Sequence, residues 1–203
     1  MISRSSVHSS LSAFDHHDRE QVDLAAEYLT FLSAHDDALW RSCAVGHITA
    51  SAIVIDAISG SVLLTLHPKV GRWLQLGGHL ENEDADLRSG SLREVAEESG
   101  VVRGLISSLP VRLDRHPVPC GREDDGSVRR SVHWDVQYAV QVEGTPRPQI
   151  SDESDDLRWF PPGDLPDSDD SVRALIRDAR RAMDGPATTH AGISESAAWV
   201  SFG

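Results

Sequence analysis

The sequence predicts an α/β domain preceded by a helical extension, and three patterns carry this prediction. Apolar residues recur at helical spacing over 19–34 and again over 171–183, which indicates an early amphipathic helix and a closing helix. Between them, the apolar residues of 132–140 alternate strictly with polar ones, as is typical of a strand with one buried face. Helices and strands that follow one another in this way belong to the α/β class.

Shorter apolar runs and turn residues predict the remaining elements. An apolar, β-branched run at 48–55, a turn at 56–60 and a second apolar run at 61–66 indicate a hairpin. Further along, we expect a strand at 109–113, a loop over the Pro-, Gly- and Asp-rich stretch 116–126 that leads to the long strand, and a short strand at 157–160.

This pattern divides the chain into three expected parts. They are an N-terminal extension with the amphipathic helix over 1–45, one main domain over 46–184, and a tail over 185–203. The tail is small and polar until Trp199-Val200, so we expect poor order there unless this apolar end docks on the domain.

Composition argues against several classes of protein. The two cysteines, Cys43 and Cys120, lack the spacing of a zinc site and the number of a disulfide framework, which favours a reducing, cytoplasmic setting. Residues 1–17 hold no apolar run, so we expect neither a signal peptide nor a membrane span. A net charge of −13 argues against a nucleic-acid polymer as partner, but a small phosphorylated ligand is compatible if metal ions supply positive charge. The sequence leaves the oligomeric state open, with a homodimer among the expectations.

The segment 92–101 gathers three carboxylates on one side of a predicted helix. At about 100° per residue, Glu94, Glu97 and Glu98 cluster opposite an apolar face. Neighbouring like charges repel by a few tenths of a kcal/mol per pair. A hard cation such as Mg²⁺ or Mn²⁺, which prefers oxygen ligands, would relieve this repulsion. For the acidic run alone, an ordinary solvated helix face is the alternative interpretation.

The residues around the acidic run favour a site. Arg93 lies four residues before Glu97, where it can pair with and orient that acid. Gly100 stands where a left-handed cap would end the helix. Upstream, Gly77-Gly78 permits a tight turn that brings backbone carbonyls or amides close to a metal or a phosphate.

These residues resemble the signature of the Nudix hydrolase family: Gly, five residues, Glu, seven residues, then Arg-Glu-U-x-Glu-Glu-x-Gly-U, with U aliphatic. The second half matches completely over 93–101. In the first half, five residues lead from Gly78 to Asp84 in place of Glu, and eight residues instead of seven precede Arg93. We interpret Asp84 as a capping residue, with Asp86 as the other candidate, and expect the loop or helix start to absorb the extra residue.

The resemblance implies a fold, a reaction and a set of site residues. The fold would be an α/β/α sandwich with a mixed sheet, over about 46–183. The reaction would be attack by metal-activated water on a diphosphate linkage in a nucleoside diphosphate derivative, with Mg²⁺ or Mn²⁺ as the cofactor. Glu94 and Glu98 would bind the metal, with the Gly78 carbonyl as a further ligand and Glu97 assisting, and Arg93 would orient the acids.

Five further residues are candidates of second rank. His67, Lys69 and Arg72 precede the glycine pair and could contact phosphates, although basic loop residues are more often plain surface. His79 follows the glycines and could hydrogen-bond substrate or metal-bound water, or be a merely polar loop residue. Glu153 stands where many family members carry a further acid that binds metal or acts as a base.

Other interpretations stay open. His133 and Asp135 share the polar face of the long strand, which a cleft or plain solvent explains equally well, and we assign them no catalytic role. A regulatory module that keeps the fold without hydrolysis would have lost an acid from 93–98, and that core is intact. An isopentenyl-diphosphate isomerase-like enzyme of the same fold would need a cysteine facing the substrate, and none lies near Gly77-Gly78 in sequence. The sequence does not choose among nucleoside diphosphate substrates.

Overall fold

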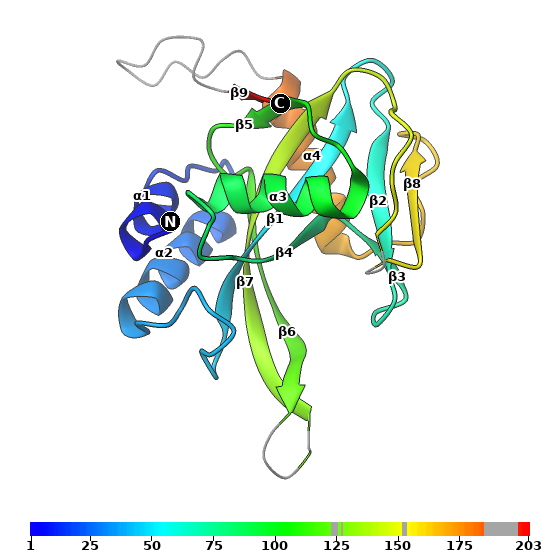
Figure 1. Ribbon diagram of the computed structural model, residues 1–203. Helices are drawn as coiled ribbons and strands as arrows, with labels where there is room; N and C mark the ends of the chain where they lie inside the picture. Colours follow the sequence, from blue (N-terminus) through cyan, green and yellow to red (C-terminus); the bar gives the residue numbers. More distant parts are fainter. Residues whose placement is uncertain (123–125, 127, 152–153, 185–198) are drawn as a thin grey trace, which may run out of the picture.

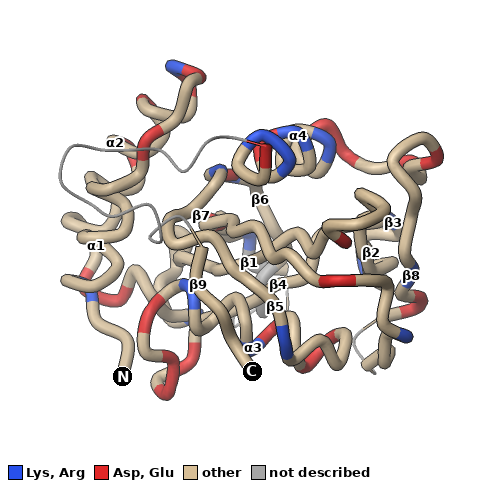
Figure 2. The backbone as a smooth tube through the Cα atoms, turned by 90° about the horizontal axis from the view of Figure 1, so that it is seen from above, with Lys and Arg blue, Asp and Glu red and all other residues tan. Residues whose placement is uncertain are grey.

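A mixed sheet lies between two helical layers, as the computed structural model shows for residues 1–122, 126, 128–151, 154–184 and 199–203. Helix α3 crosses one face of the sheet and α4 covers the other (Figures 1 and 2). The strands are β1 His47–Asp56, β2 Val62–His67, β3 Arg72–Leu74, β4 Leu76–His79, β5 Gly104–Ser107, β6 Arg112–Arg122, β7 Val128–Val142, β8 Asp156–Phe160 and β9 Trp199–Phe202. The helices are α1 Arg4–Ser12, α2 Arg19–Ala34, α3 Leu87–Ser99 and α4 Asp170–Asp184. The predicted α/β/α sandwich with a mixed sheet is confirmed.

Strand β1 is the centre of the sheet. It pairs in parallel with β7 and antiparallel with both β2 and β4. Its side chains alternate between the two faces: Ala50 and Ala52 belong to the core under α3, whereas Ile53 and Ile55 belong to the core under α4. The α4 face begins with polar residues, because His47, Thr49 and Ser51 precede the two isoleucines on the same side of the strand.

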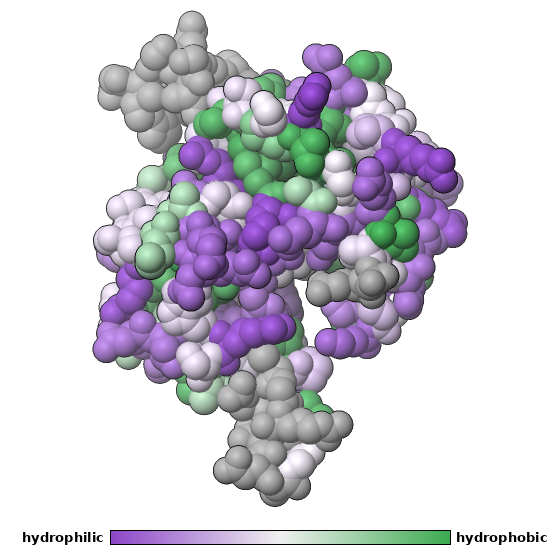
Figure 3. Space-filling view, viewed as in Figure 1, coloured by the Kyte–Doolittle hydropathy of each residue, from purple (hydrophilic) through white to green (hydrophobic). Residues whose placement is uncertain are grey.

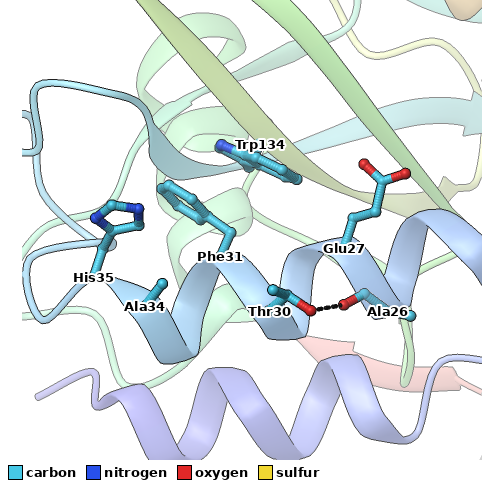
Figure 4. A pocket seen from close by; sticks show the side chains of 7 residues that line it. All are labelled: Ala26, Glu27, Thr30, Phe31, Ala34, His35 and Trp134. Carbon is cyan, nitrogen blue, oxygen red and sulfur yellow. Dashed lines mark hydrogen bonds between the residues drawn. The ribbon is translucent and has the colours of Figure 1, made fainter.

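The N-terminal extension packs on the core through aromatic rings of α2. Phe31 stacks on Trp134 of β7 with ring centroids 4.6 Å apart, and Tyr28 meets the same indole edge-on at 5.0 Å. The Tyr28 hydroxyl donates to the carbonyls of Asp114 (2.7 Å) and Asp135 (3.0 Å), which ties α2 to β6 and β7. An open pocket beside Phe31 and Trp134 contains no residue of α3 (Figure 4).

Several element predictions are confirmed and two are corrected. The helix at 19–34 and the long strand are present, and α4 extends the predicted 171–183 by one residue at each end. Helix α1 was not predicted, because its serine-rich sequence buries only Val7 and Leu11. The predicted loop over 116–126 is wrong for its first part: β6 continues to Arg122, paired with β7, because the partner strand supplies the order that the local composition does not.

The end of the chain docks on the sheet. Strand β9 pairs antiparallel with β5, so the apolar end at Trp199-Val200 meets the condition stated for order in the tail. Residues 185–198 of the predicted tail lie outside the described residues. No helix in the described part of the chain has both the length and the apolar character needed to cross a bilayer.

Candidate functional site

Helix α3 carries the acidic motif, and its two ends are capped by side chains and backbone that the sequence supplies locally. Asp86 is the N-cap: its carboxylate accepts from the Ser89 amide at 2.7 Å, and the Ser89 hydroxyl accepts in return from the Asp86 amide at 2.9 Å. Gly100 ends the helix in the left-handed conformation, with φ 72°, as predicted. The interpretation of Asp84 as the cap is therefore wrong.

Asp84 instead holds the guanidinium of Arg93 from the loop that precedes the helix. Its side chain is buried, accepts from the Glu81 amide at 2.8 Å, and accepts from Arg93 Nε (3.1 Å) and Nη2 (3.2 Å). This is a two-point pairing of a guanidinium with a carboxylate, which fixes direction as well as distance. Asp84 precedes the N-cap by two residues. The loop before the helix directs its carboxylate to Arg93 and not to the backbone amides at the helix N-terminus.

Arg93 connects the loop, strand β4 and two acids of the motif. Its Nη1 donates to Glu94 Oε1 and to Glu97 Oε2, each at 3.0 Å, and its Nη2 donates to the His79 carbonyl at 2.8 Å. Burial opposes the charge of Arg93, but hydrogen bonding to Asp84 and the charges of Glu94 and Asp84 outweigh it and raise the pKa of Arg93 above its ordinary value. The guanidinium therefore holds the carboxylates of Glu94 and Glu97 beside each other.

The glycine pair lies within strand β4 and not in the predicted tight turn, and it brings that strand against the helix and against β1. A Cβ on Gly78 would lie 2.7 Å from Glu94 Oε1, so the carboxylate occupies the space that any side chain would fill. A Cβ on Gly77, where φ is 152°, would lie 2.5 Å from the Cα of Ser51 on β1. The carboxylate of Glu94 consequently rests on the bare backbone of Gly78.

The three glutamates differ in exposure. Glu94 is 9% exposed, Glu98 is intermediate, and the Glu97 side chain is 58% exposed. The expectation that all three lie opposite the buried face is thus too simple, since Glu94 sits at the edge of the core. Hydrophilic residues form a band over α3 and the segment that leads into it (Figure 3). A hard divalent cation fits these donors, which are carboxylates beside a backbone carbonyl.

The residues of second rank fall in different places. Arg72, at the start of β3, forms an ion pair with Asp169, so its charge is already matched. His67 ends β2, and its Nδ1 accepts from the Lys69 amide at 3.2 Å in the turn that follows. Glu153 lies outside the described residues. Cys43 is buried, and burial raises the pKa of its thiol.

His79 belongs to a cluster of three histidines that the sequence did not reveal. The rings of His47, His79 and His133 lie with centroids 4.9, 4.8 and 5.1 Å apart. Burial lowers the pKa values of both His79 and His133 to about 3, and the charge of Arg41 adds to the effect on each. These two rings are therefore neutral imidazoles at neutral pH. The cluster depends on the register between strands, which the pattern of a single sequence does not specify.

Asp135 lies next to this cluster and is buried in a polar network. Its carboxylate accepts from the hydroxyls of Thr49 (2.9 Å) and Ser51 (2.6 Å) and from the amides of Gln137 (3.0 Å) and Gln75 (3.3 Å). The solvated strand face that was an alternative for His133 and Asp135 is excluded for Asp135, which is 4% exposed. The polar half of the α4 face is an organised part of the interior.

Comparisons with known proteins found several similar solved structures. Among solved structures, the NUDIX domain of Shewanella oneidensis NrtR complexed with ADP ribose is 25% identical, with a TM-score of 0.47, over 78% of this chain and 97% of that one. A NUDIX-family hydrolase from Clostridium perfringens is 21% identical, with a TM-score of 0.49, over 66% and 95%. The Escherichia coli dihydroneopterin triphosphate pyrophosphohydrolase is 14% identical, with a TM-score of 0.50, over 64% and 92%, and shows a shared fold. No curated protein matches the chain.

The family assignment rests on the sequence of the main domain. The family model described as the NUDIX domain matches residues 46–179, which is more than half of the 203 residues and includes β4, α3 and the whole acidic motif. The chain therefore belongs to the NUDIX domain family.

Proposed function

We propose that this protein is a divalent-metal-dependent hydrolase that cleaves a diphosphate linkage in a nucleoside diphosphate derivative. The observation that carries the proposal is the Arg93 clamp, which holds the Glu94 carboxylate against the bare backbone of Gly78. In a member of the NUDIX family with an intact acidic motif, this arrangement supports a metal site made of Glu94, Glu98 and the Gly78 carbonyl, with Glu97 beside them.

Each residue of the site has a physical task in this proposal. Bound Mg²⁺ or Mn²⁺ would supply charge to offset the phosphates and would acidify a bound water. Arg93 fixes the directions of Glu94 and Glu97 through two hydrogen bonds of 3.0 Å, and Asp84 fixes Arg93. Positioning of this kind reduces the entropy lost on reaching the reactive geometry.

The surroundings favour a small anionic substrate. At a net charge of −13, the protein repels a polyanion at long range, so local cations have to attract it. Lys69 and His67 are the better candidates for phosphate contact, because Arg72 already pairs with Asp169. Glu153 stays a prediction as a third acid. A cytoplasmic setting, a homodimeric state, and the absence of a membrane or nucleic-acid polymer as partner belong to the same proposal.

The test is product chromatography over a panel of nucleotide sugars, ADP-ribose, dinucleotides and oxidised nucleoside triphosphates with Mg²⁺ or Mn²⁺. We compare the wild type with Glu98→Gln and with Glu143→Gln, the same change at an exposed position after β7. Hydrolysis should disappear in Glu98→Gln and with a chelator, and persist in Glu143→Gln. Binding without turnover of any compound by the wild type would refute the hydrolase and favour the regulatory module.

A further inference from the structure

Three histidines from three different strands meet at the polar end of the α4 face. His47 opens β1 and is fully buried, His79 closes β4, and His133 lies within β7. One ligand nitrogen from each lies within 4.8 Å of the others. This grouping is separate from the carboxylates of α3, which approach the sheet from its other face.

The strand register explains how the cluster forms. His47 stands opposite His133 in the parallel β1–β7 pair, and His79 stands opposite Thr49, two residues along β1 from His47 on the same side of the strand. Direct and diagonal neighbours on one face of a sheet are within reach of long side chains. The backbone hydrogen bonds of three strands therefore hold the rings together, without reliance on a flexible loop.

The separations of the three ring centroids are those expected for a metal bound by three imidazoles. With Zn–N bonds of about 2.0 Å in a tetrahedral arrangement, the ring centroids of three histidine ligands lie about 5 Å apart. The three centroid separations here are 4.8, 4.9 and 5.1 Å. Nitrogen donors select borderline divalent ions such as Zn²⁺ and Co²⁺ over Mg²⁺, which prefers oxygen.

A buried nitrogen of His79 supports metal coordination over simple packing of the rings. His79 Nε2 is buried and has no hydrogen-bond partner within the described part of the chain. Leaving such a polar atom unsatisfied costs about 1–3 kcal/mol, which a metal bond would offset.

Neighbouring charges limit how a cation would bind here. The positive charges of Arg41 and Lys69 act on His79 and oppose a dication, whereas the carboxylate of Asp135 lies two residues from His133 on the same strand face. Attraction must therefore come mainly from the three nitrogen lone pairs. An anionic fourth ligand, such as hydroxide or a phosphate oxygen, would offset the excess positive charge.

Two other groups of metal-ligating side chains are weaker candidates. His16, His17 and Asp178 form one, but Asp178 already pairs with Arg112 at 2.8 Å and with His16 at 3.3 Å. His35, Asp37 and Cys43 form the other, but burial raises the pKa of the Cys43 thiol and so disfavours the thiolate that binds metal.

We propose that His47, His79 and His133 form a three-histidine site for a borderline divalent metal ion such as Zn²⁺, with a fourth position open to water or to an anionic ligand. The site is distinct from the carboxylate site of α3. Its existence does not depend on the proposed hydrolysis, because the donors belong to different strands and are of a different chemical type.

The test measures metal binding directly. Chelator-treated protein is titrated with Zn²⁺ and with Co²⁺ in an excess of Mg²⁺, which occupies oxygen-donor sites and leaves nitrogen-donor sites to the softer ions. The variants are His79→Gln and His133→Gln, because the partly exposed rings tolerate exchange better than fully buried His47. His8→Gln, on the exposed side of α1, is the matched control, and His35→Gln tests the competing group.

We expect one equivalent of Zn²⁺, the intense visible absorption of tetrahedral Co²⁺, and a rise in the wild-type melting temperature on adding Zn²⁺. Loss of one ligand should weaken Zn²⁺ binding by about 100-fold or more, because changes outside the ligand sphere alone cost 10–100-fold. His8→Gln, His35→Gln and Glu98→Gln should bind like the wild type. Glu98→Gln should remove only hydrolysis. The hydrolase proposal and the three-histidine site can therefore be refuted independently of each other.

Three outcomes would overturn the proposal. The first is no Zn²⁺ binding by the wild type in excess Mg²⁺, with circular dichroism showing a folded protein. The second is a Co²⁺ spectrum of octahedral oxygen coordination. The third is binding that is lost in His35→Gln and kept in His133→Gln. A change confined to the KM of the substrate in His133→Gln, without metal binding by the wild type, would make the cluster a polar substrate contact.

Discussion

The two adjacent glycines before α3 should respond in opposite ways to the same substitution. In Gly77→Ala, the new Cβ would lie 2.3 Å from the Cβ and 2.5 Å from the Cα of Ser51, and φ is 152°. In Gly78→Ala, the new Cβ would meet the end of the Glu94 side chain at 2.7 Å. The first clash involves backbone that cannot withdraw, whereas the second involves a carboxylate that can.

The magnitudes follow from what has to move. Overpacking against the β1 backbone, together with the unfavourable φ, should cost Gly77→Ala about 3 kcal/mol. For a chain of this length, this lowers the melting temperature by roughly 6–12 °C. In Gly78→Ala, Glu94 must withdraw by about 0.7 Å to reach ordinary contact, which should cost less than about 1 kcal/mol. Displacements near 1 Å in an active site reduce rates by about 100-fold.

The assay pairs thermal unfolding with kcat/KM on the best substrate of the panel. Gly163→Ala is the control, because a Cβ there meets nothing within 4 Å. We expect Gly77→Ala to lose stability and Gly78→Ala to lose activity at nearly normal stability. Equal destabilisation by both substitutions, or full activity in Gly78→Ala, would refute the reasoning from the Glu94 contact.

Two further substitutions test the charges of the fold. Arg93→Lys should lower the free energy of unfolding by about 3 kcal/mol, because an ammonium cannot satisfy the buried acids that the guanidinium fork holds. Arg88→Lys, whose pair with Asp86 is 3.6 Å long and partly exposed, should cost less than about 1 kcal/mol, and equal losses in urea denaturation would contradict the clamp. Burial lowers the pKa of His16 despite the opposing charge of Asp178, so its contribution is present above about pH 6.5 and lost as the pH falls. His16→Gln should therefore flatten the fall in unfolding free energy between about pH 7 and pH 5, and an unchanged profile would count against this assignment.

Local patterns identified the helix that carries the site. The cap at Gly100, the pairing of Arg93 with Glu97, and the helix over 19–34 all depend on residues within a few positions of one another. Such signals survive in a single sequence because neighbours on a helix are set by its fixed period. The long strand was equally readable, since alternation along β7 needs no knowledge of its partners.

Only the tertiary structure decided which residues meet through strand register and through reversal of the chain. The sequence by itself determined the acidic helix, its C-terminal cap at Gly100 and the family signature. It could not show that Asp84 turns under Arg93, that β6 extends through a stretch rich in proline and glycine, or that His47, His79 and His133 meet. Each of these contacts joins positions on separate elements through strand pairing or chain reversal, and a shift of one residue in register would move those side chains to the opposite face of the sheet.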